Sequence, residues 1–116
     1  MSEKLKVSPE KIDEAKKMQL VKFSGDFDKA GFSDVRSELN ELVKSFDQKY
    51  LIFDFGGLEF INSEGIGYLL EVNNMLSKND KVLGVVGVNR YIADIFDTIG
   101  IKDIVKIGGK AEDIIK

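Results

Sequence analysis

The hydrophobic residues of this chain follow two spacings, one typical of β-strands and one typical of amphipathic helices. Two nearly continuous apolar runs, 50–55 and 82–88, have the pattern of strands that are buried on both faces of a sheet. Shorter runs at 18–23 and 104–107 also predict strands, and alternation with lysines over 5–7 predicts a short edge strand. The glycine pair that follows the first long run is expected to end that strand.

Helical spacing predicts three helices, over 32–46, 62–77 and 89–99, and a helical tail over 111–116. The first is expected to be capped by Asp28 or Ser33. The third is expected to begin after an Asn89 cap and to end at Gly100 as its C′ residue. The predicted buried stripe of the third helix consists of Ile92, Ile95, Phe96 and Ile99.

Strands that alternate with helices predict parallel pairing through right-handed crossovers. The expected fold class is α/β, with a mixed, mostly parallel β-sheet and helices packed on one side of it. Within the N-terminal region 1–17, residues 8–17 fit two interpretations. Ser8 and Pro9 are typical of a helix start, but only Ile12 and Ala15 are available for burial, so a turn or loop is equally consistent.

The composition fits one globular domain over 1–116 and weighs against most enzymes. The chain has 116 residues, 43% of them hydrophobic, and it contains neither cysteine nor histidine. These two absences exclude disulfides, thiolate or histidine metal sites and the Ser-His-Asp triad. No phosphate-binding glycine loop is present either. We therefore expect a protein that is not an enzyme and has no metal or other cofactor.

Charge is distributed unevenly along the chain. The net charge is −3, and residues 25–77 carry four basic and ten acidic side chains. This balance predicts neither nucleic-acid binding nor membrane binding, and a basic protein surface would complement the acidic segment. The charged N-terminus lacks the apolar core of a secretory signal, and no apolar stretch is long enough to span a bilayer, so we expect a cytoplasmic protein.

Candidate chemistry concentrates where a strand runs into the second predicted helix, at Ser63. Its hydroxyl is expected at or beside the N-cap, close to unpaired backbone N–H groups. Capping by Asn62 or Ser63 is one interpretation. A phosphorylation site is the other, because a helix N-terminus accommodates a phosphate and exposes its charge to a partner. A receiver-type aspartyl phosphate at Asp54 is disfavoured, because Asp54 lies within a strand rather than at its end.

The second predicted helix carries two apolar stripes. Ile66, Leu69, Leu70 and Leu76 form the expected core face. A second stripe beside it consists of Tyr68, Val72 and Met75. That stripe fits packing on a neighbouring helix and exposure to a partner equally well.

Three segments together resemble the STAS domain, the fold of bacterial anti-sigma factor antagonists. Gly25-Asp26-Phe27-Asp28 is similar to the family's Gly-x-Leu-Asp segment, and the junction 60–66 occupies the place of its Asp-Ser-Ser/Thr-Gly-Leu/Ile segment. Gly87-Val88-Asn89, Ile92 and 98–101 match a third stretch. The resemblance extends from about residue 18 to the C-terminus, with the order and spacing of the motifs kept.

The resemblance implies a phosphorylation-switched anti-sigma factor antagonist that regulates sigma-factor-dependent transcription. The expected partners are an anti-sigma factor that is also a serine kinase and, for a phosphate cycle, a phosphatase; the chain itself would be a monomer or weak homodimer. Ser63 would accept the phosphoryl group. The partner-binding residues would be Gly25, Asp26, Phe27, Asp28, Asn62, Glu64, Gly65, Ile66 and Tyr68.

Two departures from the family motif support an alternative. Asn62 stands where the family has Asp, and Glu64 stands where it has Ser or Thr. Asn62 keeps hydrogen-bonding capacity without the charge, and Glu64 places a carboxylate beside the acceptor. The alternative is a STAS scaffold or stress-signalling module that docks partners without phosphate cycling.

Overall fold

The computed structural model describes residues 4–115, which form five strands and three α-helices in the predicted alternating order. The strands are β1 (Lys6–Pro9), β2 (Met18–Phe27), β3 (Tyr50–Ile61), β4 (Val82–Val86) and β5 (Lys106–Gly108). The helices are α1 (Lys29–Ser45), α2 (Ser63–Ser77) and α3 (Arg90–Ile99). Short 3₁₀ turns follow α3 at Ile101–Asp103 and β5 at Ala111–Asp113.

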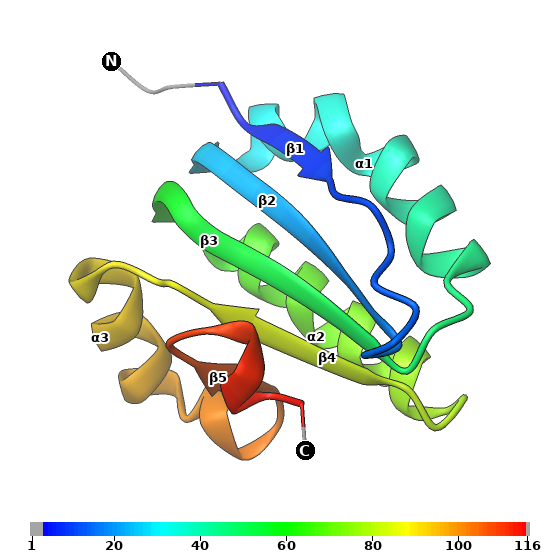
Figure 1. Ribbon diagram of the computed structural model, residues 1–116. Coiled ribbons are helices and arrows are strands. Elements are labelled where there is room, and N and C mark those ends of the chain that lie inside the picture. The colour runs from blue at the N-terminus through cyan, green and yellow to red at the C-terminus, as the bar shows by residue number, and fades with distance from the viewer. Residues whose placement is uncertain (1–3, 116) are drawn as a thin grey trace.

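The strands form one sheet in the order β1-β2-β3-β4-β5, as Figure 1 shows. β1 pairs antiparallel with β2, and the other three pairs are parallel. Helices α1 and α2 lie behind the sheet in this view and cover one of its faces. The predicted fold class, a mixed and mostly parallel α/β sheet, is confirmed.

The main core lies between the sheet and the helices. It is built from alternate residues of β2, β3 and β4 and from the inner faces of the three helices. Its largest fully buried side chains are five phenylalanines, namely Phe23, Phe27, Phe53, Phe55 and Phe96. β4 is buried without interruption from Leu83 to Val86, as predicted for a strand that is covered on both faces of the sheet.

β3 does not end at its glycine pair, as the sequence predicted, but continues to Ile61. Lys22 of β2 pairs with Asp54, and Ser24 pairs with Gly57. Between these two pairs β2 advances by two residues and β3 by three. The extra residue has the arrangement of a β-bulge. Gly56 and Gly57 are therefore the site of an irregularity within the strand.

The described part of the N-terminal region, residues 4–17, contains the strand β1 and a turn. Ser8 and Pro9 belong to β1, where they pair with Lys22 and Val21, so the helix start was the wrong interpretation and the turn or loop the right one. Turn residues follow Asp13, and Lys17 closes the turn in a left-handed conformation with φ 57°. Proline is tolerated at this place because β1 is an edge strand.

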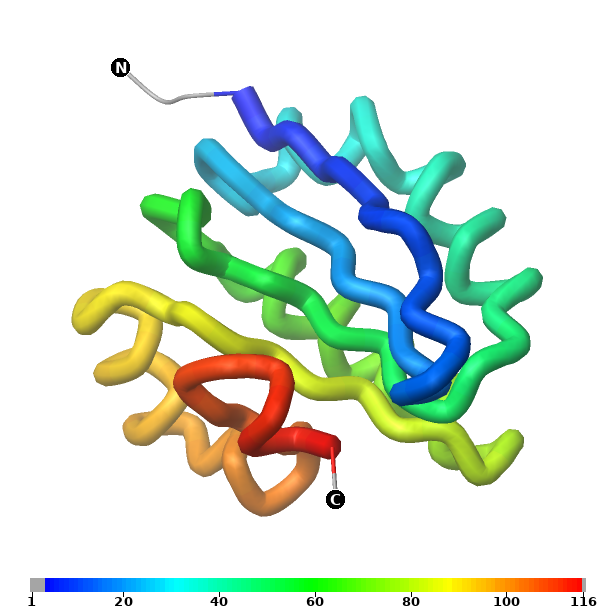
Figure 2. The backbone as a smooth tube through the Cα atoms, in the orientation of Figure 1, coloured from blue at the N-terminus to red at the C-terminus, as the bar shows by residue number. Residues whose placement is uncertain are grey.

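The C-terminal residues turn back over the face of the sheet opposite α1 and α2 (Figure 2). Ile114 packs there in a second, smaller cluster with Met18, Ile52 and Val86. The predicted C-terminal helix is only the 3₁₀ turn Ala111–Asp113. Both faces of the sheet therefore carry an apolar cluster, and the smaller one is covered by the end of the described chain.

Candidate functional site

Each of the three α-helices begins with a side-chain cap just after a parallel strand. Asp28 Oδ1 accepts a hydrogen bond from the Gly31 N–H at 2.8 Å, and Asn62 Oδ1 accepts one from the Gly65 N–H at 3.1 Å. Asn89 caps α3 in the same way, as predicted. Because parallel strands have their carboxyl ends at one edge of the sheet, the three helix N-termini lie at that edge.

Hydrogen bonds tie these junctions to one another. The Asn62 backbone N–H donates to the Phe27 carbonyl at 3.1 Å, which connects the start of α2 to the end of β2. The Asn89 side-chain amide donates to the Leu58 carbonyl at 3.2 Å, which connects the start of α3 to β3. The segment around Ser63 is consequently held from both sides.

Ser63 is the first residue of α2, and its side chain is exposed. Asn62 is the N-cap, so the capping role that Asn62 and Ser63 shared in the sequence interpretation falls to Asn62. Glu64, also exposed, lies in the first turn, where a negative charge interacts favourably with the helix dipole. The Ser63 hydroxyl is thus accessible and close to the positive end of α2.

Several residues predicted to bind a partner are instead part of the core. Phe27 is fully buried, and Tyr68 is only 4% exposed. Gly25 and Gly65 are buried as well, and Asp26 is 9% exposed. Direct partner contact through Phe27 or Tyr68 is therefore a wrong prediction, because helical and strand spacing cannot distinguish an interface residue from one that packs on a neighbouring element.

Gly65 shows how closely α2 packs on the sheet. A Cβ atom at this position would lie 2.7 Å from Ile61 Cγ1 and 2.8 Å from Phe27 Cδ1. Only glycine fits where the helix and the sheet approach each other this closely.

Of the predicted docking residues, Glu64 is exposed. Asp28, at the α1 cap, and Asn62 and Ile66, close to Ser63 in the chain, are half-buried.

Tyr68 belongs to an aromatic cluster that joins α1 to α2. Its ring lies 4.6 Å from that of Phe32, and its hydroxyl donates to Asn40 Oδ1 at 2.9 Å. Burial raises the pKa of Tyr68 to about 12, and the nearby Glu71 carboxylate adds to the rise. Tyr68 and Val72 face inward, so this stripe of α2 serves helix packing rather than exposure.

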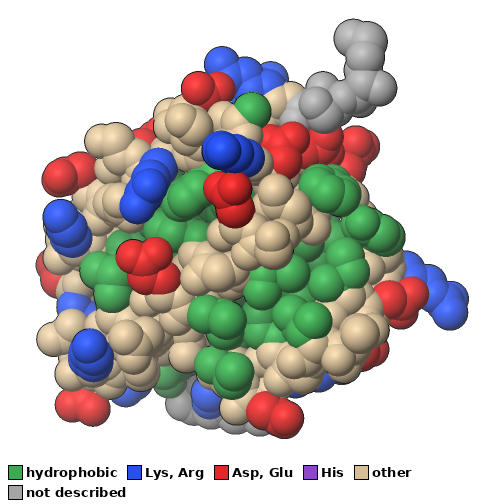
Figure 3. All heavy atoms as spheres, turned by 180° about the vertical axis from the view of Figure 1, so that it is seen from behind, with side chains coloured by type: hydrophobic (Ala, Val, Ile, Leu, Met, Phe, Trp, Pro, Cys, Tyr) green, Lys and Arg blue, Asp and Glu red, His purple; other side chains and the backbone are tan. Residues whose placement is uncertain are grey.

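Sequence reasoning missed a partly exposed apolar patch, which we call the α3 patch: Phe60, Tyr91, Ile95 and Ile99. The rings of Phe60 and Tyr91 stack with centroids 6.1 Å apart, and Tyr91 and Ile99 are 52% and 50% exposed. Hydrophobic side chains gather on the α3 side of the helix-covered face in Figure 3. The i, i+4, i+8 spacing of Tyr91, Ile95 and Ile99 is the signal that could have found it.

The buried stripe of α3 is therefore narrower than the sequence predicted. Ile92 and Phe96 are fully buried, whereas Ile99 lies on the exposed side.

Among residues 4–115, no group of three or more potential ligand side chains could hold a metal ion. Within the same residues, no helix is both long and apolar enough to cross a membrane.

These features define a small α/β domain with an accessible serine where a buried parallel strand gives way to a helix. A family model described as STAS domain matches residues 9–114. The chain therefore belongs to the STAS domain family, and the resemblance inferred from its motifs is confirmed.

Solved structures that share this fold include anti-sigma factor antagonists. One from Mycobacterium paratuberculosis is 19% identical, with a TM-score of 0.80, over 94% of this chain and 89% of that one. The Bacillus cell fate determinant SpoIIAA in its phosphorylated form is 16% identical, with a TM-score of 0.68, over 94% and 96% of the two chains.

A STAS domain protein from Planctomyces limnophilus, described as an anti-sigma-factor antagonist, is 11% identical, with a TM-score of 0.74, over 97% and 94% of the chains. At these identities the similarity establishes the fold. A comparison with curated proteins finds no significant match.

Proposed function

We propose that this protein is a cytoplasmic anti-sigma factor antagonist whose docking is switched by phosphorylation of Ser63. The unmodified form would capture an anti-sigma factor that is also a serine kinase, and so free a sigma factor for transcription. ATP and the catalytic groups would come from the partner, and this chain would supply only the acceptor hydroxyl. A phosphatase would complete the cycle.

The observation that carries this proposal is the placement of Ser63 at the first position of α2. The helix is already capped by Asn62, so modification of the serine leaves the capping bond intact. The hydroxyl is exposed and accessible to a kinase. A phosphate there would lie near free backbone N–H groups and the positive end of the helix dipole, which favours an anion.

The surroundings of Ser63 support partner docking. Phe60 of the α3 patch precedes Ser63 closely in the chain, is 36% exposed and stacks on Tyr91. Glu59 and Glu64 on either side of this junction are exposed carboxylates. An apolar patch with acidic neighbours suits a partner surface that has apolar anchors and basic groups around them.

The alternative is a STAS scaffold that docks partners without a phosphate cycle. It is favoured by Glu64, because a carboxylate next to Ser63 repels a phosphate of about −1.5 to −2 charges. The two functions share a docking surface and differ in whether the serine is modified.

Incubation of the protein with a candidate anti-sigma kinase and ATP tests the acceptor. Intact mass and site mapping should show one phosphate on Ser63, and Ser63→Ala should remain unmodified. Ser33→Ala, which changes an exposed serine of α1, is the matched control and should be modified like the parent. Modification of Ser63→Ala to the parent level would place the acceptor elsewhere, and absence of modification by every cognate kinase would favour the scaffold.

Binding by Ser63→Asp tests the switch itself. A negative charge at the first turn should leave the free energy of unfolding within about 1 kcal/mol of the parent. Capture of the anti-sigma partner should weaken, because the added charge changes the surface that the partner reads. Titration calorimetry measures the affinity, and parent-like binding by Ser63→Asp would contradict the switch.

A further inference from the structure

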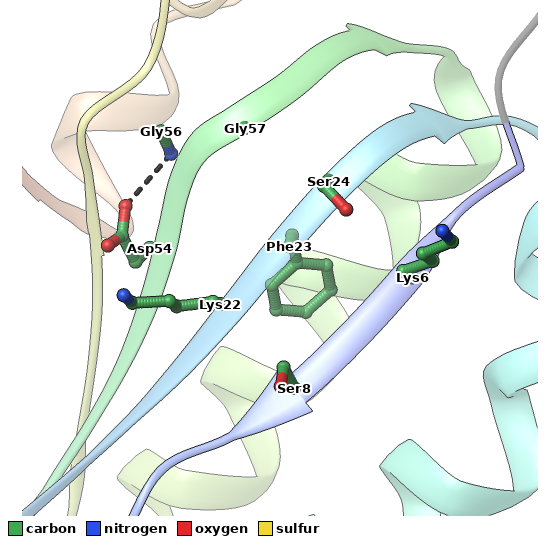
Figure 4. A pocket seen from close by; sticks show the side chains of 8 residues that line it. All are labelled: Lys6, Ser8, Lys22, Phe23, Ser24, Asp54, Gly56 and Gly57. Carbon is green, nitrogen blue, oxygen red and sulfur yellow. Dashed lines mark hydrogen bonds between the residues drawn. The ribbon is translucent and has the colours of Figure 1, made fainter.

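The face of the sheet opposite α1 and α2 is divided into two parts. The apolar part, around Ile52 and Val86, is covered by Ile114 and its neighbours. The other part is open and carries a hollow of about 420 Å³ over β1, β2 and β3. The hollow is lined by Lys6, Ser8, Lys22, Phe23, Ser24, Asp54, Gly56 and Gly57. Figure 4 shows these residues grouped over the three strands.

Strand register brings the polar side chains of this hollow to one face. Lys22 pairs with Ser8 of β1 on one side and with Asp54 of β3 on the other. Ser24 likewise lies between Lys6 and Gly57. Paired residues of neighbouring strands point to the same face, so two ammonium groups, two hydroxyls and a carboxylate share this face of the sheet. In Figure 4 the Lys22 side chain extends toward Asp54, on the side away from Lys6.

Glycines shape the end of the hollow nearest Asp54. The Gly56 N–H donates to Asp54 Oδ1 at 2.8 Å (Figure 4), which fixes the carboxylate. A Cβ atom at Gly87, where φ is 74°, would lie 3.1 Å from the same oxygen. At Gly57 a Cβ atom would lie 3.0 Å from Ser24 Cβ. The bulge thus removes side chains from this end and holds one carboxylate in a set position.

The charges of the hollow suit a ligand with both an anionic group and hydroxyls. Lys6 and Lys22 supply two positive charges, and Asp54 supplies one negative charge. Lys22 is paired with Glu10 at 3.4 Å, and both of these side chains are at least half exposed. Among residues 4–115, Lys6 takes part in none of the ion pairs. An anion between the lysines would therefore compete only with the Glu10 contact.

We propose that this hollow binds a small phosphorylated polyol of the sugar-phosphate class. Lys6 and Lys22 are exposed side chains on neighbouring strands, and they would turn toward each other to hold the phosphate, with the Ser8 and Ser24 hydroxyls as further donors. Hydroxyls of the ligand donate to the Asp54 carboxylate, which can accept further hydrogen bonds beside the one from Gly56. The site is on the face of the sheet opposite α2, so it is separate from the proposed Ser63 switch.

Titration calorimetry with ribose 5-phosphate as the probe tests this site. Ribose and inorganic phosphate are titrated separately for comparison. Ribose 5-phosphate should bind with a Kd below about 1 mM, and about tenfold more tightly than either ribose or inorganic phosphate. No heat of binding at this level would overturn the proposal. Equal binding of inorganic phosphate would overturn the ligand class, because the hydroxyl contacts to Asp54 would contribute nothing.

Surface variants localise the binding. Lys22→Met and Lys6→Met should each weaken it about tenfold, and Lys78→Met, which changes an exposed lysine at the end of α2, should not. Glu10→Gln should strengthen it about threefold, because the competing ion pair is lost. Unchanged binding in both hollow variants would overturn the proposal. Since Ser63 plays no part, Ser63→Asp should bind the probe like the parent, whatever the outcome for the switch.

Discussion

Tyr68 links the protonation state of one buried phenol to the packing of two helices. Its hydroxyl donates to Asn40 of α1, so the neutral form is the one that fits the α1–α2 contact. Burial raises its pKa to about 12 from the ordinary value of 10.0. The folded state therefore keeps this proton at a pH where the unfolded chain has released it.

The free energy of unfolding should consequently fall as pH rises between 10 and about 12. Over this range the folded state binds more protons at Tyr68 than the unfolded state does, so stability decreases with pH; below pH 10 the contribution is fully present. Urea denaturation across the range measures the slope. Tyr68→Phe should flatten it, and should cost about 1 kcal/mol at neutral pH for the lost hydrogen bond.

Tyr91→Phe is the matched control, because Tyr91 is 52% exposed and lies outside the α1–α2 contact. It should keep the slope of the parent. If Tyr68→Phe also keeps that slope, the alkaline loss of stability belongs to other groups.

Local residue signals were predictable and tertiary burial was not. The Asn89 cap and the Gly100 C′ residue, with φ 72°, follow from side-chain chemistry within one turn, and the structure confirms both. Phe27 and Tyr68 were assigned to a docking surface, although both are buried. Their burial depends on the contact between α1 and α2, which no local spacing specifies.

Among the secondary-structure elements, α3 separates its two apolar stripes most clearly. Ile92 and Phe96 face the core, and Tyr91, Ile95 and Ile99 form the α3 patch on the other side. The sequence placed Ile95 and Ile99 in the core stripe, because periodicity alone cannot set the width of the buried face. The exposed stripe is therefore available for partner contact.

Phe96→Ala should lower the free energy of unfolding by about 3–5 kcal/mol, because it leaves a cavity where a fully buried ring was. Ile99→Ala on the same helix should cost less than about 1 kcal/mol, since its side chain is half exposed. Chemical denaturation measures both. A loss of similar size in the two variants would contradict this division of α3.

β3 shows why a strand boundary can be misread. Two adjacent glycines usually interrupt a strand, and here they form a bulge within it. The strand continues because Leu58 and Ile61 bury side chains beyond the bulge, a tertiary effect. The bulge also shapes the sheet-face hollow, a tertiary feature that the local sequence pattern did not predict.

The two surfaces for which we propose functions lie at different places on one sheet. One is the edge that carries the helix N-termini and Ser63, and the other is the hollow around Asp54 on the open face of the sheet. The C-terminal segment covers the apolar part of that sheet face, around Ile52 and Val86. The sequence predicted a helical tail there, but it contained no local signal for where that tail would dock.

Ile114 is the residue through which the C-terminal segment is held. It is 2% exposed, and a Cβ atom at Gly84 would lie only 2.7 Å from its Cγ2 atom, so the side chain rests directly on the β4 backbone. Ile114→Ala should lower the free energy of unfolding by about 2–4 kcal/mol. The half-buried neighbour in Ile115→Ala is the control, and its loss should be smaller.

The loss in Ile114→Ala has an upper limit, because the segment can detach while the main core between the sheet and the helices stays intact. Detachment would uncover Met18, Ile52 and Val86, an apolar surface that binds hydrophobic dyes. The variant should therefore bind such a dye under native conditions, where the parent does not, and keep its far-ultraviolet circular dichroism. A parent-like stability without dye binding would mean that the C-terminal segment does not protect this face of the sheet.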